Sequence, residues 1–473
     1  MIFAVFYANL LSGLIRASGH TETLRMNGIH RYRTRFGPLL IASILWGCLI
    51  TPSCLADIFP NPPAIQPTVQ FWLSIYTQYP LTQGVVHDSR YPDTVYEIIQ
   101  LKHPGAPGAN RTNEHRMRQA RNTYRNILDR LIEHPDSKDP EVRRVADLFG
   151  AAVTPSQLRK AKRRIRCQVG QRDRFREGLI RSATHIDAIR AIFRNAGLPE
   201  DLAYLPHVES SFNYHAHSKS GAVGIWQFTR RTGRHFLKID SALDERFDPL
   251  RASEAAARLL KTNYKRIESW PLAITAYNHG ISGMLRAKRR HKTYASIFQD
   301  YRSRRFRFAS RNFYPEFLAA REAAANAHSY FDNLPSSGQR HTFQAVPEGF
   351  VPFKAVANHF KLDADLLHQL NPALRPPVIN GLQDIPAGYP IHLPAHEWQN
   401  RLAYNARIPH EILGARQKAC PVYRVRKGDT VAAIAHRHNL KVIDLVAANN
   451  LSKRGNRIFV NQKLRLPMSK RRL

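Results

Sequence analysis

Cysteine is scarce in this chain of 473 residues, which contains only Cys48, Cys54, Cys167 and Cys420. No two of them have the CxxC spacing of a metal or redox site. The first two lie in a predicted N-terminal signal region, so processing would leave two cysteines in different predicted domains. The sequence therefore argues against a disulfide framework.

Acidic residues are also scarce, because 36 Asp and Glu stand against 71 Lys and Arg, giving a formal net charge of +35. The isoelectric point is about 10.6. Such a surface attracts polyanions, namely nucleic acid, an anionic membrane or an acidic polymer. No nucleic-acid-binding module is visible, and the basic residues are spread along the chain. A carboxylate-bearing cell-wall polymer satisfies the same electrostatics, so we predict no nucleic-acid partner and leave membrane association open.

The chain also lacks a recognisable metal motif. No HExxH or comparable ligand spacing occurs, although His215, His217, His235 and His279 lie near the central motifs described below. With 22 histidines scattered through a basic chain, most are expected to be solvated. We therefore predict neither a metal site nor another cofactor.

The longest N-terminal apolar run, 36–50, is shorter than the roughly 20 residues that a membrane-spanning helix needs. Three arginines precede it and small residues follow up to Ala56, which is the pattern of a secretory signal peptide. We assign residues 1–56 to this region and expect translation to start at Met26. A lipoprotein site at Cys48 and a membrane anchor are the alternatives. The protein is thus expected in the periplasm or cell envelope, with a free or lipidated N-terminus.

Length and composition predict a globular protein of two to four domains, with 43% hydrophobic and 10% aromatic residues. The Pro-rich stretch 60–67 is typical of a linker. Residues 112–166 combine Arg and Lys with interleaved Leu, Ile and Val, which indicates basic amphipathic helices. We assign 57–169 to an N-terminal helical segment and 170–332 to an all-α domain.

The all-α domain is organised around one acidic residue in the stretch 205–228, LPHVESSFNYHAHSKSGAVGIWQF. Gly197 closes one predicted helix, and Pro199 opens the next, which carries Glu209 near its C-terminal end. The negative end of the helix dipole and an apolar wall both disfavour an ionised carboxylate there. Glu209 is therefore predicted to hold a proton near neutral pH and to donate it as a cleft acid.

Four motifs stand in a fixed order along this domain: ESSFNYHAHSKSGAVGIWQF, ALDERFDP, WPLAITAYNHG and NFYPEFLAA. Together they resemble the signatures of the lytic murein transglycosylases with a goose-lysozyme-like domain, and in particular the membrane-bound transglycosylase D group. The resemblance implies a mainly α protein with a lysozyme-like all-α catalytic domain. It also implies cleavage of the β-1,4 bond between N-acetylmuramic acid and N-acetylglucosamine in peptidoglycan glycan strands.

The resemblance further implies roles for individual residues. Glu209 would act first as general acid and then as general base, while the substrate's acetamido group and 6-hydroxyl replace a protein nucleophile and give a 1,6-anhydro product. Trp226 and Phe228 either stack on sugars or belong to the core. The residues that match the family's substrate-binding positions are Ser220, Gln227, Tyr277, Asn278 and Tyr314. Tyr277 would orient the acid or the acetamido group, Asn278 would support the backbone around Glu209, and Tyr314 would reach the acid.

Two other functions stay open. A muramidase needs a second carboxylate, and the candidates Asp240, Asp244 and Asp248 are better explained as helix caps and turn formers. An inert wall-binding scaffold would be favoured if Glu209 were replaced, which it is not.

The C-terminal part contains two copies of one pattern. Residues 421–468 alternate as a strand, two short helices and a strand, and resemble the glycan-binding lysin motif (LysM), whose hallmarks match Gly428, Asp429, Thr430 and Asn449. Residues 341–395 follow the same template, but Phe350-Val351 replaces the Asp-Thr pair. We therefore predict two βααβ units, of which the first is degenerate.

Overall fold

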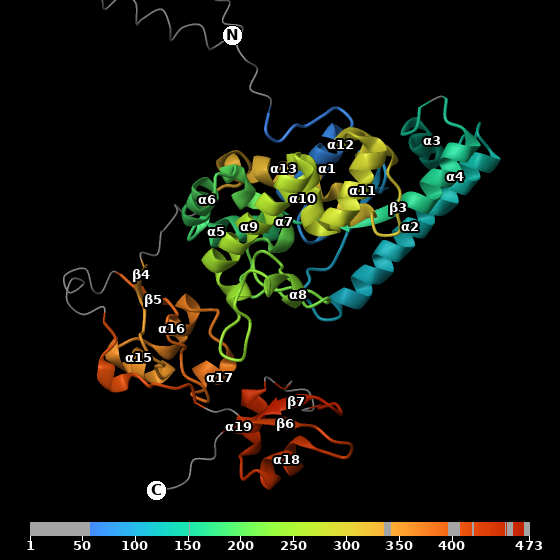
Figure 1. The fold of residues 1–473 in the computed structure, drawn as a ribbon. Coiled ribbons are helices and arrows are strands. Elements are labelled where there is room, and N and C mark those ends of the chain that lie inside the picture. The colour runs from blue at the N-terminus through green and yellow to red at the C-terminus, as the bar shows by residue number, and fades with distance from the viewer. Residues whose placement is uncertain are drawn as a thin grey trace, which may run out of the picture. The chain divides into compact units, whose positions relative to one another are not determined.

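The computed structural model describes residues 57–150, 152–334, 342–395, 407–418, 421–449, 451 and 457–467 (Figure 1). The predicted signal region lies outside these residues. The described residues all belong to one unit of the chain. Its described residues are mainly helical with a few small sheets, which confirms the predicted mainly α class. Among the described helices, none has the length and apolar character needed to cross a membrane.

The N-terminal segment contains a three-stranded antiparallel sheet in the order β2-β1-β3, which the sequence analysis did not foresee. Its central strand β1 pairs with both neighbours, and β3 lies far away in the sequence. The strands are β1 (Gln83–Asp88), β2 (Val95–Gln100) and β3 (Ile165–Val169). The basic amphipathic helices predicted for 112–166 are present as α2 (Ala109–Glu133), α3 (Pro140–Asp147) and α4 (Pro155–Arg164).

Helix α1 (Gln66–Thr77) packs into the core of the all-α domain. The Trp72 indole N–H donates a buried hydrogen bond of 3.0 Å to Asn312 Oδ1. The Tyr76 ring stacks on Phe175 with 4.9 Å between ring centroids. One continuous hydrophobic core therefore runs across the predicted boundary near residue 170.

The all-α domain is built from helices whose ends follow the predicted signals. Asp248 caps α9, with its carboxylate accepting from the Leu250 and Arg251 amides at 2.9 Å each, and Pro249 takes the first helical position. The acid's helix is the short α7, which ends at Ser210. The main helices are α5 (Arg172–Ser182), α6 (Ile186–Asn195), α7 (Leu205–Ser210), α9 (Pro249–Ile267), α10 (Trp270–His279), α11 (Ile281–His291), α12 (Tyr294–Asp300) and α13 (Phe308–Ala325).

Each C-terminal unit has the predicted βααβ order and an antiparallel pair of strands. We call the first one the LysM-like unit (342–394). Its elements are β4 (Thr342–Ala345), α15 (Phe353–His359), α16 (Ala364–Leu370), the extra turn α17 (Pro376–Ile379) and β5 (Ile391–Pro394). Those of the second unit are β6 (Val422–Arg424), α18 (Val431–Arg437), α19 (Val442–Ala448) and β7 (Lys463–Arg465).

The two units share one side-chain hydrogen-bond pattern, which we call the asparagine clamp. The Asn371 amide donates to the Leu367 and His392 carbonyls at 2.9 and 2.8 Å and accepts from the His392 N–H at 2.9 Å. Asn449 makes the equivalent three bonds to Leu445 and Arg465, at 2.8, 2.8 and 2.6 Å. The clamp joins the end of the second helix to the closing strand, so the internal repeat seen in the sequence is a repeat of structure.

A buried ion pair braces the loop that follows the catalytic helix. Arg246 binds both carboxylate oxygens of Asp244, at 2.8 and 2.7 Å, and both side chains are almost fully buried. The same guanidinium donates to the carbonyls of Gly221 and Phe228. Gly224 adopts φ +75° and approaches so closely that a Cβ there would lie 1.9 Å from the Arg246 carbonyl oxygen. Only glycine fits at this contact.

Replacing Arg246 tests this brace. We expect Arg246→Ala to lower the free energy of unfolding by about 3–5 kcal/mol, because it leaves the Asp244 carboxylate buried without its partner. Urea denaturation measures this loss, and Arg251→Ala, which removes a half-exposed arginine from the same region, is the matched control. A loss below about 1 kcal/mol in Arg246→Ala would contradict the proposed brace.

Candidate active site

Glu209 lies on the last turn of α7, where Ser211 and Phe212 adopt left-handed conformations and end the helix. Its side chain is half-buried. Burial raises the pKa of its carboxyl to about 8, so the group is protonated at neutral pH. Within the described residues no Lys, Arg or His forms an ion pair with Glu209. The desolvated carboxyl that the sequence predicted is therefore present at the predicted helix end.

The loop that follows α7 is tied to α7, α9 and α10 by three hydrogen bonds. Ser210 Oγ donates to the Ile225 carbonyl at 2.9 Å. The Trp226 indole N–H donates to Ser253 Oγ at 2.7 Å, and the Tyr277 hydroxyl donates to the Trp226 carbonyl at 2.8 Å. The Trp226 side chain is fully buried and Phe228 nearly so, which places both in the core and not on an open sugar-binding surface.

Tyr277 is the predicted substrate-binding residue whose side chain is coupled to the acid. The negative charge that Glu209 carries when ionised adds to burial in raising the pKa of the Tyr277 hydroxyl. Because that hydroxyl is bonded to the Trp226 carbonyl, it fixes the loop against α10. A direct role toward substrate stays a prediction.

The other predicted substrate-binding residues differ in how deeply their side chains are buried. Ser220 is exposed in a tight turn, with its Oγ 3.0 Å from Ser218 Oγ. Gln227 is half-buried with φ 49°, and its amide donates to the Gly224 carbonyl at 2.8 Å. Asn278 was expected to support the backbone around Glu209, but its Oδ1 accepts from Ser310 Oγ of α13 at 2.8 Å. Asn278 therefore joins α10 to α13.

The prediction that Tyr314 reaches the acid is corrected by its position. Its side chain is fully buried, and its hydroxyl donates to the Pro60 carbonyl at 2.8 Å. The ring packs edge-on against Tyr294, with 4.9 Å between centroids. The preceding residue, Phe313, instead lies parallel to the Tyr277 ring at 6.4 Å. The helix thus presents Phe313, not Tyr314, to the side where Tyr277 lies.

Glu316 is a second half-buried carboxyl that the sequence analysis missed. It lies one turn after Phe313 on α13, which packs against both α1 and α7. Burial raises its pKa to about 8, and repulsion from an ionised Glu209 contributes to the increase. The signal was available, since Glu316 belongs to the NFYPEFLAA motif and shares a helical face with Asn312 and Phe313.

Two further side chains interact electrostatically with the carboxyl group of Glu209 or of Glu316. Tyr76 of α1 is buried, and its hydroxyl pKa is raised by burial and by the charges of Glu316 and Glu209. Arg166 of β3 lowers the pKa of Glu316 and lies over the Phe308 ring at 4.1 Å. The N-terminal segment therefore contributes side chains to the surroundings of the acid.

The four predicted LysM residues hold their own unit together. Asp429 Oδ2 accepts from the Tyr423 hydroxyl at 2.8 Å and the Arg426 amide at 2.7 Å. Thr430 caps α18 by accepting from the Ala433 amide at 3.1 Å. Gly428 has φ +87°, and Asn449 forms the clamp described above. Their hallmark spacing thus reflects the fold, and glycan contact by them stays a prediction.

The histidines near the motifs do not gather with acidic or cysteine side chains. Across the described ranges, no three His, Cys, Asp or Glu side chains are placed so that they could hold a metal ion.

Comparison with known proteins defines the class. The model of the transglycosylase SLT domain matches residues 188–298, and the LysM domain model matches 423–467. The chain thus carries a lysozyme-like transglycosylase SLT domain followed by a LysM domain, which confirms the resemblance found in the motifs.

Two curated relatives and one solved structure are similar to parts of the chain. The chain is homologous to the membrane-bound lytic murein transglycosylase D of Escherichia coli, with 25% identity over 296 residues in strain K12 and the same figures in strain O6:H1. This match covers 60% of the chain and 64% of those relatives, so it spans less than two thirds of their length. The solved lytic transglycosylase Slt of Pseudomonas aeruginosa shows 17% identity and a TM-score of 0.25, covering 48% of this chain and 34% of its own.

The raised pKa of Glu209 predicts a pH-dependent effect of its replacement on stability. The folded state favours the protonated carboxyl, so its contribution is fully present below the unfolded-state pKa near 4.3 and is lost as pH rises through about 8. We expect Glu209→Gln to stabilise the fold at pH 9, by on the order of a few kcal/mol, and to change it little at pH 4.

Chemical denaturation at the two pH values measures this difference. Glu133→Gln, which changes an exposed glutamate, is the control. Its effect on the free energy of unfolding should be the same at pH 4 and pH 9. An equal effect of Glu209→Gln at pH 4 and pH 9 would show that the Glu209 carboxyl is not desolvated in the folded protein.

Proposed function

We propose that this protein is a lytic transglycosylase that acts on murein and cleaves the β-1,4 bond between N-acetylmuramic acid and N-acetylglucosamine. The observation that carries the proposal is the protonated Glu209 carboxyl at the end of α7, within an SLT domain. A proton held near neutral pH can be given to a glycosidic oxygen as the bond breaks.

The reaction scheme follows from the motif resemblance and needs one carboxyl. Glu209 protonates the leaving oxygen while the acetamido group of the muramic sugar assists its departure. The Glu209 carboxylate then takes the proton of the sugar's 6-hydroxyl as that oxygen attacks the anomeric carbon. A 1,6-anhydro end and a free N-acetylglucosamine end result, Glu209 is protonated again, and no water is consumed.

The second carboxyl, that of Glu316, makes hydrolysis the second candidate function. A muramidase uses a second carboxylate as nucleophile or base, and that group must be ionised. Burial and repulsion from Glu209 raise the pKa of Glu316 to about 8, so it is neutral at pH 7. A neutral Glu316 is a poor nucleophile, but it also does not repel the Glu209 carboxylate formed after proton transfer. The transglycosylase scheme is therefore the better supported one.

The LysM domain supports the same substrate. A glycan-binding module on one chain with the catalytic domain raises the effective concentration of an insoluble polymer at the cleft. The strongly basic chain adds electrostatic attraction to anionic wall polymers. We therefore place the protein in the cell envelope, with peptidoglycan glycan strands as its partner.

Mass spectrometry of digested peptidoglycan tests the function. The parent protein should release muropeptides one water lighter than muramidase products, and Glu209→Gln should release at least 100-fold less, because loss of general acid catalysis costs about 10²–10⁴-fold in rate. Glu316→Gln should retain anhydro products. Similar melting temperatures at pH 4, where Glu209→Gln is expected to change stability little, ensure that the variants compared are folded.

Other product patterns would contradict the proposal. Hydrated products that disappear in Glu316→Gln would establish a two-carboxylate hydrolase. A complete lack of products from a folded parent protein that still binds peptidoglycan would establish a wall-binding scaffold.

A further inference from the structure

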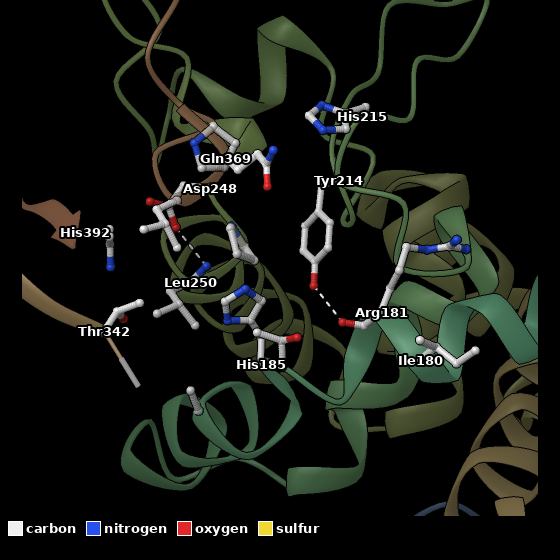
Figure 2. A pocket seen from close by; sticks show the side chains of 15 residues that line it. Ile180, Arg181, His185, Tyr214, His215, Asp248, Leu250, Thr342, Gln369 and His392 are labelled. Atoms are coloured by element: carbon white, nitrogen blue, oxygen red, sulfur yellow. Dashed lines mark hydrogen bonds between the residues drawn. The ribbon is translucent and has the colours of Figure 1, made fainter. Parts of the chain in front are cut away.

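A cavity of about 840 Å³ lies between the catalytic domain and the LysM-like unit (Figure 2). One wall comes from the end of α5, the start of α6 and the loop after the catalytic helix, and includes Arg181, His185 and Tyr214. The opposite wall includes Gln369 and His392 of the LysM-like unit. Glu209 is not part of the lining, so this cavity is separate from the acid. Its volume is within the range of about 300–1,000 Å³ typical of ligand sites.

The two walls are joined by main-chain hydrogen bonds. The Asp244 amide donates to the Ala373 carbonyl at 2.8 Å, and the Arg375 amide donates to the Ala242 carbonyl at 2.9 Å. Leu243 forms an antiparallel bridge with Leu374 and is buried in the hydrophobic core of the LysM-like unit. The segment 242–244 also carries Asp244, the partner of Arg246, so the junction is continuous with the brace of the catalytic loop.

The charged groups in the lining are already satisfied by protein partners. The Arg181 guanidinium donates to the Ser211 carbonyl at 3.2 and 2.8 Å and pairs with Glu177. The Asp248 carboxylate accepts the two amides that it caps. Burial lowers the pKa of His392, which keeps its ring neutral. The guanidinium of Arg181 and the carboxylate of Asp248 are thus already bonded within the protein.

The remaining lining suits a particular ligand chemistry. The Tyr214 hydroxyl donates to the Arg181 carbonyl at 2.8 Å, which fixes the ring across the cavity, as Figure 2 shows. The Gln369 amide and the Thr342 hydroxyl supply neutral donors and acceptors, and Leu250 adds apolar surface. A ring surface with uncharged hydrogen-bonding groups matches an uncharged polyhydroxylated ligand, whereas an anion would meet an arginine, Arg181, whose guanidinium is already bonded to the Ser211 carbonyl and to Glu177.

We propose that this cavity is a second saccharide-binding site, which holds an uncharged N-acetylhexosamine segment of the glycan away from the point of cleavage. The proposal rests on the proposed function, since it takes the same polymer as ligand. The site is joined to the acid by Arg181, because this residue binds the Ser211 carbonyl just after α7 and anchors Tyr214. The LysM-like unit then acts as one wall of a shared site.

Histidine footprinting on the full-length Glu209→Gln protein tests this site without requiring cleavage. The probe is the tetramer of N-acetylglucosamine, and diethyl pyrocarbonate modification is followed by mass spectrometry at each histidine. We expect the tetramer to slow modification of His215 and His392 at least threefold. The exposed His217, which does not line the cavity, should react at an unchanged rate.

Variants separate this cavity from the LysM domain and the cleft. Tyr214→Ala and Gln369→Ala should abolish the protection of His392, whereas Tyr214→Phe, which keeps the ring, should retain it. Gln344→Ala changes an exposed glutamine of the same unit outside the lining and is the matched control. If Tyr214→Ala fails to fold, Gln369→Ala carries the test.

Unprotected His215 and His392 at saturating tetramer would overturn the proposal, as would protection that persists in Gln369→Ala. Failure of the proposed function is recognised separately, because it appears as missing or hydrated products from the parent protein.

Discussion

The site depends on one physical constraint: among the residues that the structure describes, no counter-ion pairs with Glu209. A carboxyl in a desolvated position keeps its proton only if no cation stabilises the charged form. This is a demanding condition in a chain with 71 Lys and Arg. Two arginines of this domain are engaged by other groups: Arg246 binds Asp244 and two carbonyls, and Arg181 binds Ser211 and Glu177.

The same constraint explains why the N-terminal segment belongs to the catalytic body. Desolvation of Glu209 requires packing from neighbouring elements, and a short helix such as α7 cannot supply that packing alone. Helix α1 completes the enclosure through Trp72 and Tyr76, and Trp72 is held by the buried bond to Asn312 of α13. The N-terminal segment, which precedes the all-α domain in the sequence, therefore contributes to the surroundings that keep Glu209 protonated.

Local patterns predicted much of this arrangement, and non-local contacts account for what they missed. The cap at Asp248, the position of Glu209 at a helix end and the two βααβ units follow from signals within a few residues. The sheet was missed because β1 pairs with β3 across residues 89–164, much of which lies in the stretch 112–166 that was predicted as helices. Tyr314 was assigned to the site from its motif alone, and the side of α13 that faces the acid depends on packing. Glu316 looked like any surface glutamate until its burial was visible.

The asparagine clamp has a consequence for how the C-terminal modules diverge. Asn371 and Asn449 make the same three bonds, although the loop that carries Asp429-Thr430 in one unit carries Phe350-Val351 in the other. In the first unit the Phe350 main chain exchanges two hydrogen bonds with Gly414. The clamp thus secures the scaffold independently of the variable loop. A duplicated module of this kind can exchange one recognition surface for another at little cost in folding, which makes the loop a natural point for grafting new specificities.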